Sequence, residues 1–136
     1  MTTIDPLRVA RELAAALDRC DFDEAAAHLS PDCHYRIGSE ELVGPDAIIA
    51  SYRESAEWGR RTLDQVVYES QVTQGPGGPS VLYIDGLTHH GQTCEYRCRQ
   101  HFMLNDAGQV VHILHEELPG EREKLDAFFA KVGVKR

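Results

Sequence analysis

Four strand-like segments fill the second half of the sequence and limit most strongly the folds that this chain can adopt. Each is rich in Val, Tyr, Ile and Thr, and the turn sequences GPGGP, HG and NDAG separate one from the next. Short Gly-, Pro- and Asn-containing breaks between such runs are typical of antiparallel hairpins. We therefore expect a four-stranded antiparallel meander over residues 63–72, 80–89, 93–104 and 109–118.

Helical patterns precede and follow this meander. Apolar residues recur at helical spacing after Asp5, an N-cap candidate, and Pro6, which suits the first helical position. We expect helices over 5–22, 21–30, 44–59 and 120–133, with a further strand over 33–39. Pro31 should stop the second helix at Ser30, and Gly59 should end the third. Helices first and strands afterwards predict an α+β fold, with N-terminal helices packed on a curved antiparallel sheet.

The bulk composition is that of one globular domain, residues 1–136, with 42% hydrophobic and 26% charged residues. No apolar run approaches membrane-spanning length, and the net charge of −8 makes nucleic acid an unfavourable partner. The N-terminal sequence lacks the pattern of a secretion signal, so we expect a cytoplasmic protein. Its cysteines should then be reduced and mostly buried: Cys20, Cys33, Cys94 and Cys98.

Turn geometry predicts which side chains share the inner face of the sheet. A two-residue turn at HG pairs His89 with Gln92, and a four-residue loop at NDAG pairs Leu104 with Gln109. The expected inner rows are Val81, Gln100 and Ile113; Tyr83, Cys98 and His115; and Asp85, Tyr96 and Glu117. An apolar floor with converging polar groups is typical of a ligand cavity.

The same register predicts the outer face. It places His101 opposite His112 and Arg97 opposite Glu116. Two imidazoles supply only half of the ligands of a structural zinc site, so we expect no metal. Exposed apolar residues among the charges would suit a two-fold dimer through this face: Met103, Val110 and Leu114.

His115 is the main candidate for a catalytic group, because an imidazole both takes and gives protons near neutral pH. Glu117 could tune this imidazole, and Gln100 could donate a hydrogen bond to an oxyanion. The opposing interpretation is a core histidine satisfied by a neighbour.

Several further residues are candidates for ligand binding, although each could simply fill core volume, pack at a helix end or lie at a solvated rim. They are Tyr35, Trp58, Tyr83, Asp85, Tyr96, Cys98, Phe102 and Ile113. The sequence has no glycine-rich phosphate loop, GxSxG, HExxH or nucleotide fingerprint, so we expect no cofactor.

The order of elements, ending in NDAGQVVHILHEEL, resembles the nuclear transport factor 2-like superfamily over nearly the whole chain. The resemblance implies a cone-shaped α+β fold of the cystatin-like type with an internal pocket. That superfamily includes ketosteroid isomerases, SnoaL-like polyketide cyclases, scytalone dehydratase, limonene-epoxide hydrolase and noncatalytic binding proteins, so it predicts fold better than chemistry.

Individual positions depart from the family patterns. RQHFMLNDAGQVV is similar to the isomerase strand that bears an acidic oxyanion-hole donor, and that donor falls on Gln100. The isomerase base falls on Tyr35 or Ile37, and its helix-borne tyrosine falls near Leu13. In the SnoaL-like pattern, His115 takes the place of the acid/base aspartate. A steroid isomerase is therefore disfavoured, but a proton-transfer group remains.

The resemblance and the residues together predict a homodimeric pocket protein for a small, largely apolar organic molecule. It would isomerise, dehydrate, cyclise or hydrolyse that molecule, with His115 as general acid/base. Two alternatives stay open: noncatalytic binding of a small metabolite, and a dimeric subunit or adaptor that works through its sheet surface.

Overall fold

The computed structural model describes residues 4–135, which form an α+β fold as the sequence predicts. In chain order the elements are α1 (Pro6–Asp18), α2 (Phe22–Ala27), β1 (Leu29–Ile37), β2 (Glu40–Val43), α3 (Pro45–Thr62), β3 (Gln65–Gln74), β4 (Pro79–His89), β5 (Gln92–Leu104), β6 (Val110–Glu117) and α4 (Glu121–Val132). Within residues 4–135, no helix combines the length and the apolar character that crossing a bilayer requires.

The six strands form one mixed sheet in the order β2-β1-β6-β5-β4-β3. The expected meander is confirmed, because β3 through β6 pair in sequence order and antiparallel. The expectation of a purely antiparallel sheet is wrong, since β1 runs parallel to β6. No tight turn joins these two strands. One helix and four strands separate them in the chain, so they can pair in a parallel orientation.

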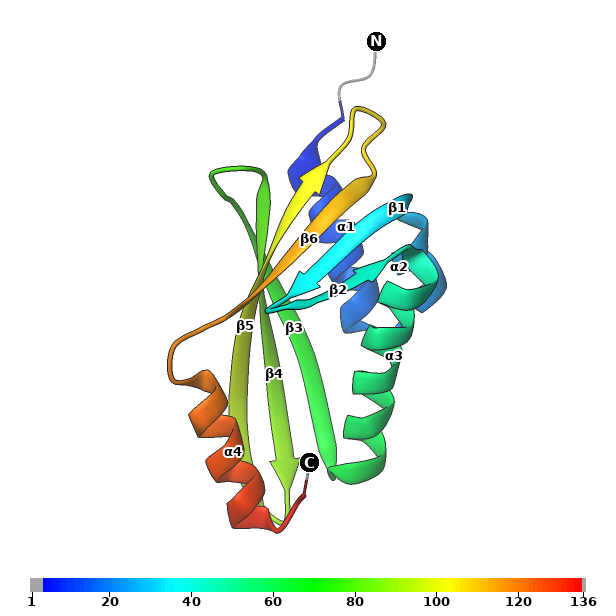
Figure 1. The fold of residues 1–136 in the computed structure, drawn as a ribbon. Helices are drawn as coiled ribbons and strands as arrows, with labels where there is room; N and C mark the ends of the chain where they lie inside the picture. The colour runs from blue at the N-terminus through cyan, green and yellow to red at the C-terminus, as the bar shows by residue number, and fades with distance from the viewer. Residues whose placement is uncertain (1–3, 136) are drawn as a thin grey trace.

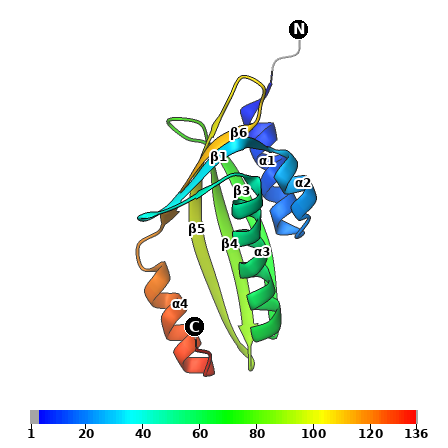
Figure 2. The same ribbon diagram turned by 45° about the vertical axis from the view of Figure 1, so that its right-hand side comes forward.

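The sheet curves strongly around the helices (Figures 1 and 2). Helix α1 packs against β3 and β4, and α3 packs against β1, β2 and β3. In both views β4 and β5 extend well below the ends of β1 and β6, and α4 lies along β5 in that lower half. Together α3, α4 and the long strands enclose the wide end of a cone.

Local sequence signals explain most of the helix ends. The Asp5 carboxylate accepts a hydrogen bond from the backbone N–H of Leu7 at 3.0 Å, and Pro6 is the first residue of α1. Asp21 caps α2 in the same way. At the other end of the chain, Gly133 ends α4 with φ of 74°, a left-handed conformation that favours glycine.

The helix ends expected at Ser30 and Gly59 are both wrong. Helix α2 ends at Ala27, and Ser30 belongs to β1. Gly59 does not end α3, which continues to Thr62. The Cβ that Gly59 lacks would lie 3.2 Å from a side-chain carbon of Val66, so the glycine allows close packing inside the helix. The short strand β2 was not predicted, because four mostly exposed residues have no clear strand pattern.

The register between β4 and β5 matches the prediction, with Asp85 opposite Tyr96 and Tyr83 opposite Cys98. The register between β5 and β6 differs by two residues, so His115 pairs with Gln100 and not with Cys98. Five loop residues, 105–109, separate the first pair, Leu104 and Val110, and an irregularity follows directly. The five-residue loop and the irregularity each shift the pairing by one residue. Because strand side chains alternate with a period of two, the combined shift leaves His115 on the expected inner face.

In the observed register, the side chains that lie opposite each other on the outer face of β5 and β6 differ from those predicted. His101 lies opposite Leu114, not His112, and its Nε2 is 2.9 Å from the Glu116 carboxylate. Arg97 does not pair with Glu116, because its guanidinium contacts Glu95.

At Val110, which precedes the irregularity, the register differs by only one residue, and this moves its side chain from the expected outer face into the core. Val110 is fully buried and pairs with Leu104. Exposed apolar side chains remain on the outer face at Met103 and Leu114, which are 53% and 42% exposed.

Candidate active site

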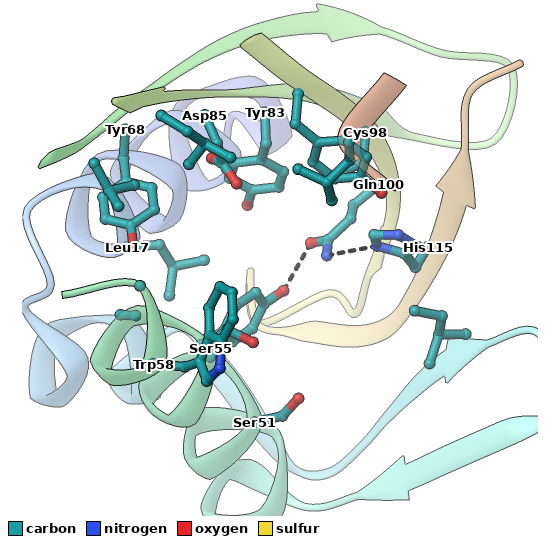
Figure 3. A pocket seen from close by; sticks show the side chains of 18 of the residues that line it. Leu17, Ser51, Ser55, Trp58, Tyr68, Tyr83, Asp85, Cys98, Gln100 and His115 are labelled. Atoms are coloured by element: carbon teal, nitrogen blue, oxygen red, sulfur yellow. Dashed lines mark hydrogen bonds between the residues drawn. The ribbon is translucent and has the colours of Figure 1, made fainter. Parts of the chain in front are cut away.

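A cavity of about 360 Å³ lies between the helices and the concave face of the sheet. This volume falls at the lower end of the range for small-molecule sites. Most of its wall is apolar or aromatic, with contributions from α1, α3, α4 and all six strands. Figure 3 shows polar side chains at two places along that wall.

The first polar group, which we name the Gln100 pole, consists of Tyr35, Tyr52, Gln100 and His115. Gln100 is its centre and is only 2% exposed. Its side-chain oxygen accepts a hydrogen bond from the Tyr52 hydroxyl at 2.7 Å. Its amide nitrogen donates to the Tyr35 hydroxyl and to Nδ1 of His115, each at 3.3 Å. The buried amide therefore uses both its donors and its acceptor.

These contacts define how His115 can exchange protons. Nδ1 also lies 3.4 Å from the Tyr35 hydroxyl, so it is an acceptor and the neutral ring carries its proton on Nε2. Contacts of 3.3–3.4 Å are long, so a ligand can displace them at little cost. The neutral ring can take a proton at Nδ1 once a donor has been displaced, and the resulting imidazolium can then give a proton to a ligand.

Burial lowers the pKa of His115 from its ordinary value of 6.5, because desolvation disfavours the imidazolium. Glu117 acts in the opposite direction and Arg122 adds to the lowering. His115 is therefore largely neutral at pH 7 and available as a base. Burial likewise raises the pKa of the Tyr35 and Tyr52 hydroxyls, so both stay protonated donors.

The second polar group, the Asp85 pole, consists of Asp18, Tyr68, Tyr83 and Asp85. Burial and the nearby Asp18 carboxylate raise the pKa of Asp85 to about 6. Burial also raises the pKa of Asp18, although a hydrogen bond from the Ser70 hydroxyl at 2.6 Å opposes that shift. The pole therefore holds two carboxyl groups whose charges disfavour each other.

Eight predicted residues lie together on the cavity wall: Tyr35, Trp58, Tyr83, Asp85, Tyr96, Cys98, Gln100 and His115. Phe102 and Ile113 are predicted ligand contacts that do not line it; they pair across β5 and β6 in the core. The two-residue register shift places Ile113 opposite Phe102, in the row next to the one that holds Gln100 and His115.

Glu117, a predicted partner of His115, also lies off the cavity wall. Its side chain is exposed and accepts a hydrogen bond from Arg122, which does line the cavity. Its charge favours the imidazolium form of His115 and so opposes the effect of burial on the His115 pKa. Trp58 lines the cavity and packs edge-on against Phe129 of α4, with ring centroids 5.5 Å apart, so both of its expected roles apply.

Sequence reasoning missed Tyr52, Tyr68 and Asp18. Tyr52 follows the buried Ile48 by one helical turn in α3, a spacing that could have identified it. Asp18 is an acid in the last turn of α1, where the helix dipole favours cations. An unfavourable charge at this position could also have identified Asp18 as a candidate site residue.

Among residues 4–135, no group of three or more His, Cys, Asp or Glu side chains is arranged to hold a metal ion. All four cysteines are free, as the sequence predicts; Cys33 and Cys98 are buried, Cys94 is half-buried and Cys20 is exposed. Burial raises the pKa of the Cys98 thiol to about 12, so it is not a thiolate nucleophile at neutral pH.

No protein-family model and no curated protein matches the sequence. Solved structures do match the fold. A nuclear transport factor 2-like protein from Burkholderia pseudomallei gives a TM-score of 0.67 at 14% identity, covering 93% of this chain and 96% of that one. An LEH-like epoxide hydrolase from M. tuberculosis gives 0.59 at 20% identity, with coverages of 93% and 96%.

A third similar structure is SalBIII, an epoxide hydrolase/cyclase-like enzyme associated with pyran ring formation in the polyether salinomycin. It gives a TM-score of 0.66 at 12% identity and covers 85% of this chain and 92% of that one. These likenesses confirm the nuclear transport factor 2-like cone fold. Activity does not follow from a shared fold, so function must be argued from the cavity.

Proposed function

We propose that this protein binds a small, largely apolar organic molecule in its cavity and catalyses proton transfer on it without a cofactor. The observation that carries the proposal is the position of His115, whose ring lies on the cavity wall with Nδ1 held by Gln100 and Tyr35. A neutral, oriented imidazole on the wall of a largely apolar cavity is suited to general acid/base catalysis.

The neighbouring groups have complementary roles. Gln100 fixes the tautomer of His115 and can turn its amide N–H to a developing oxyanion when a ligand displaces the imidazole contact. Tyr35 offers a second neutral donor at the same place. Glu117 favours the imidazolium through its charge and so assists protonation of the ring.

The reaction class is isomerisation, dehydration, cyclisation or hydrolysis of the bound molecule. Two proteins of similar structure, an LEH-like epoxide hydrolase and an epoxide hydrolase/cyclase-like enzyme, favour cyclisation and hydrolysis for a first search. Opening an epoxide needs an acid at the leaving oxygen and a base at the attacking hydroxyl or water. A residue that gives and takes protons, as His115 does, is compatible with either role.

Two probes test the proposal without knowledge of the natural substrate. Deuterium incorporation into 2-tetralone reports proton abstraction next to a carbonyl, and hydrolysis of styrene oxide reports epoxide opening. For the probe that is turned over, His115→Ala should lose at least about a hundredfold in rate, because general acid/base groups contribute on that scale. His112→Ala is the matched control on the outer face of the same strand, and it should retain full activity.

Noncatalytic binding is a second candidate, favoured by the mutual satisfaction of Gln100, Tyr35 and Tyr52. Such a site is complete without any proton transfer. A ligand that stabilises the protein against heat, depends on Gln100 and is recovered chemically unchanged after long incubation would favour this alternative over catalysis.

We further propose that the protein is a cytoplasmic homodimer formed through the outer face of the sheet. Exposed Met103 and Leu114 lie there among charged groups, a mixture common in dimer interfaces. Four free cysteines are compatible with a reducing compartment.

A further inference from the structure

The Asp85 pole contains a buried hydroxyl group, that of Tyr83, which is suited to binding a ligand oxygen. Tyr83 is only 9% exposed, lines the cavity, and its hydroxyl has no hydrogen-bond partner in the described part of the chain. Figure 3 shows its ring on the cavity wall next to Asp85. Buried polar atoms in native proteins are nearly always paired, so an unpaired hydroxyl on a side chain that lines a cavity points to an oxygen supplied by a ligand in that cavity.

Asp85 is placed to contact the same ligand atom or its neighbour. It lies two residues from Tyr83 on β4, so both side chains share the inner face. Its pKa of about 6 makes both the acid and the carboxylate accessible near neutral pH. The acid can donate to a ligand carbonyl or ether oxygen, and the carboxylate can accept from a ligand hydroxyl.

Burial and a second carboxylate, Asp18, dominate the electrostatic surroundings of Asp85. The titratable groups that face it are Asp18 from α1, Tyr68 from β3, Tyr83 on its own strand, and Tyr96 and Cys98 from β5, with Arg60 of α3 acting on Tyr68. Acids and neutral hydroxyls dominate this set. A cationic ligand group is not required, because Asp85 can be neutral.

The spacing of the two poles gives a rough measure of ligand length. Gln100 pairs with Val81, and Asp85 lies four residues further along β4. Four strand residues span roughly 13 Å. One hydrogen-bonding group of a ligand therefore cannot serve both poles, whereas a molecule with oxygen atoms at both ends of an apolar body can.

We propose that Asp85 and Tyr83 form a second ligand-binding station, opposite the Gln100 pole, and that the cavity selects elongated apolar molecules with an oxygen function at each end. The Tyr83 hydroxyl donates to the distal oxygen, and Asp85 donates to it or accepts from it. This inference rests on the proposed function only in that the same cavity binds the ligand; it does not require that His115 be catalytic.

Two probes with the same apolar body test the inference: 4-phenylphenol, with one hydroxyl, and 4,4′-biphenol, with one at each end. Calorimetry, or quenching of the single tryptophan, Trp58, gives both affinities. The wild-type protein should bind 4,4′-biphenol at least about tenfold more tightly. Tyr83→Phe and Asp85→Asn should reduce that preference to about twofold or less, while Asp106→Asn on an exposed loop should preserve it.

The outcomes separate this inference from the proposed function. If 4-phenylphenol binds with dependence on Gln100 but the second hydroxyl adds nothing, the second station is refuted and the proposed function stands. If neither probe binds, the second station is refuted, and turnover of 2-tetralone or styrene oxide decides the proposed function separately. A crystal structure with 4,4′-biphenol should show one hydroxyl within hydrogen-bond distance of Tyr83 or Asp85, and a hydroxyl placed elsewhere would overturn the inference.

Discussion

His115 and Glu116 are adjacent in β6 but lie on opposite faces of the sheet. His115 lines the cavity and contacts Gln100, whereas Glu116 contacts His101 on the outer face. Alternation along a strand produces this separation. The imidazole of His115 can therefore contact a ligand in the cavity, whereas the carboxylate of Glu116 lies on the outer face, away from the cavity.

The first prediction compares two buried tyrosines. Tyr52→Phe should lower the free energy of unfolding by about 1–3 kcal/mol, because it leaves the buried side-chain oxygen of Gln100 without its donor. Tyr83→Phe should be nearly neutral, since that hydroxyl has no partner among residues 4–135. Urea denaturation at pH 7 gives both values, and an equal loss in the two variants would contradict the described contacts.

The second prediction concerns the pH dependence of stability. The pKa of Asp85 is raised from 3.8 to about 6 on folding. Its protonated form is therefore favoured in the folded state, and the associated stability is complete below pH 3.8 and lost as pH rises through 6. Asp85→Asn should stabilise the protein at pH 7 by up to about 3 kcal/mol, and this gain should vanish near pH 4.

Denaturation of Asp85→Asn and wild-type protein at several pH values checks this second prediction. Asp106→Asn, at an exposed loop position, is the matched control and should show no pH-dependent difference. A stabilisation by Asp85→Asn that is the same at pH 4 and pH 7 would show that the carboxyl charge is not its cause.

The third prediction tests whether α4 closes the wide end of the cone. Phe129 packs on Trp58 and lines the cavity, so Phe129→Ala should cost about 3 kcal/mol or more and expose the indole. Acrylamide quenching of Trp58, the single tryptophan, should increase. Ala127→Ser, on the exposed side of α4, should change neither quantity. Unchanged quenching in Phe129→Ala would mean that α4 does not shield the cavity.

The fourth prediction tests the proposed dimer. Leu114→Asp places a charge at the centre of the outer face, where Leu114 is 42% exposed, and should convert a dimer to a monomer. Sedimentation velocity measures the change. Ala127→Asp adds the same charge on α4, away from the outer face, and should leave the dimer intact. A wild-type protein that sediments as a monomer at tens of micromolar would refute the dimer.

The sequence predicted the β4–β5 register because a two-residue turn leaves little freedom for pairing. It missed the β5–β6 register because a longer loop and an irregularity near Val110 each shift the pairing by one residue. A single shift would have turned His115 outward, but two shifts return it to the inner face. The inward orientation of His115 was therefore predicted correctly, but its cross-strand partner, Gln100, was not.

The site itself could be predicted only in part. His115, Gln100 and Asp85 follow from strand alternation, which is a local property of the chain. The contact from Tyr52 to Gln100 joins residues 48 positions apart, and it depends on how α3 packs against the sheet. Local sequence patterns can indicate that Tyr52 faces inward, but they do not predict that it contacts Gln100, because this contact depends on tertiary packing.

The most direct test of the central claim compares two titrations. NMR gives the pKa of the His115 ring, and turnover of the active probe, measured as kcat/KM against pH, gives the pKa of the catalytic base. We expect both values to lie below 6.5 and to coincide, because burial disfavours the imidazolium and the same ring would be titrated in both measurements. A rate profile that does not follow the titration of His115 would contradict its role as the proton-transfer group.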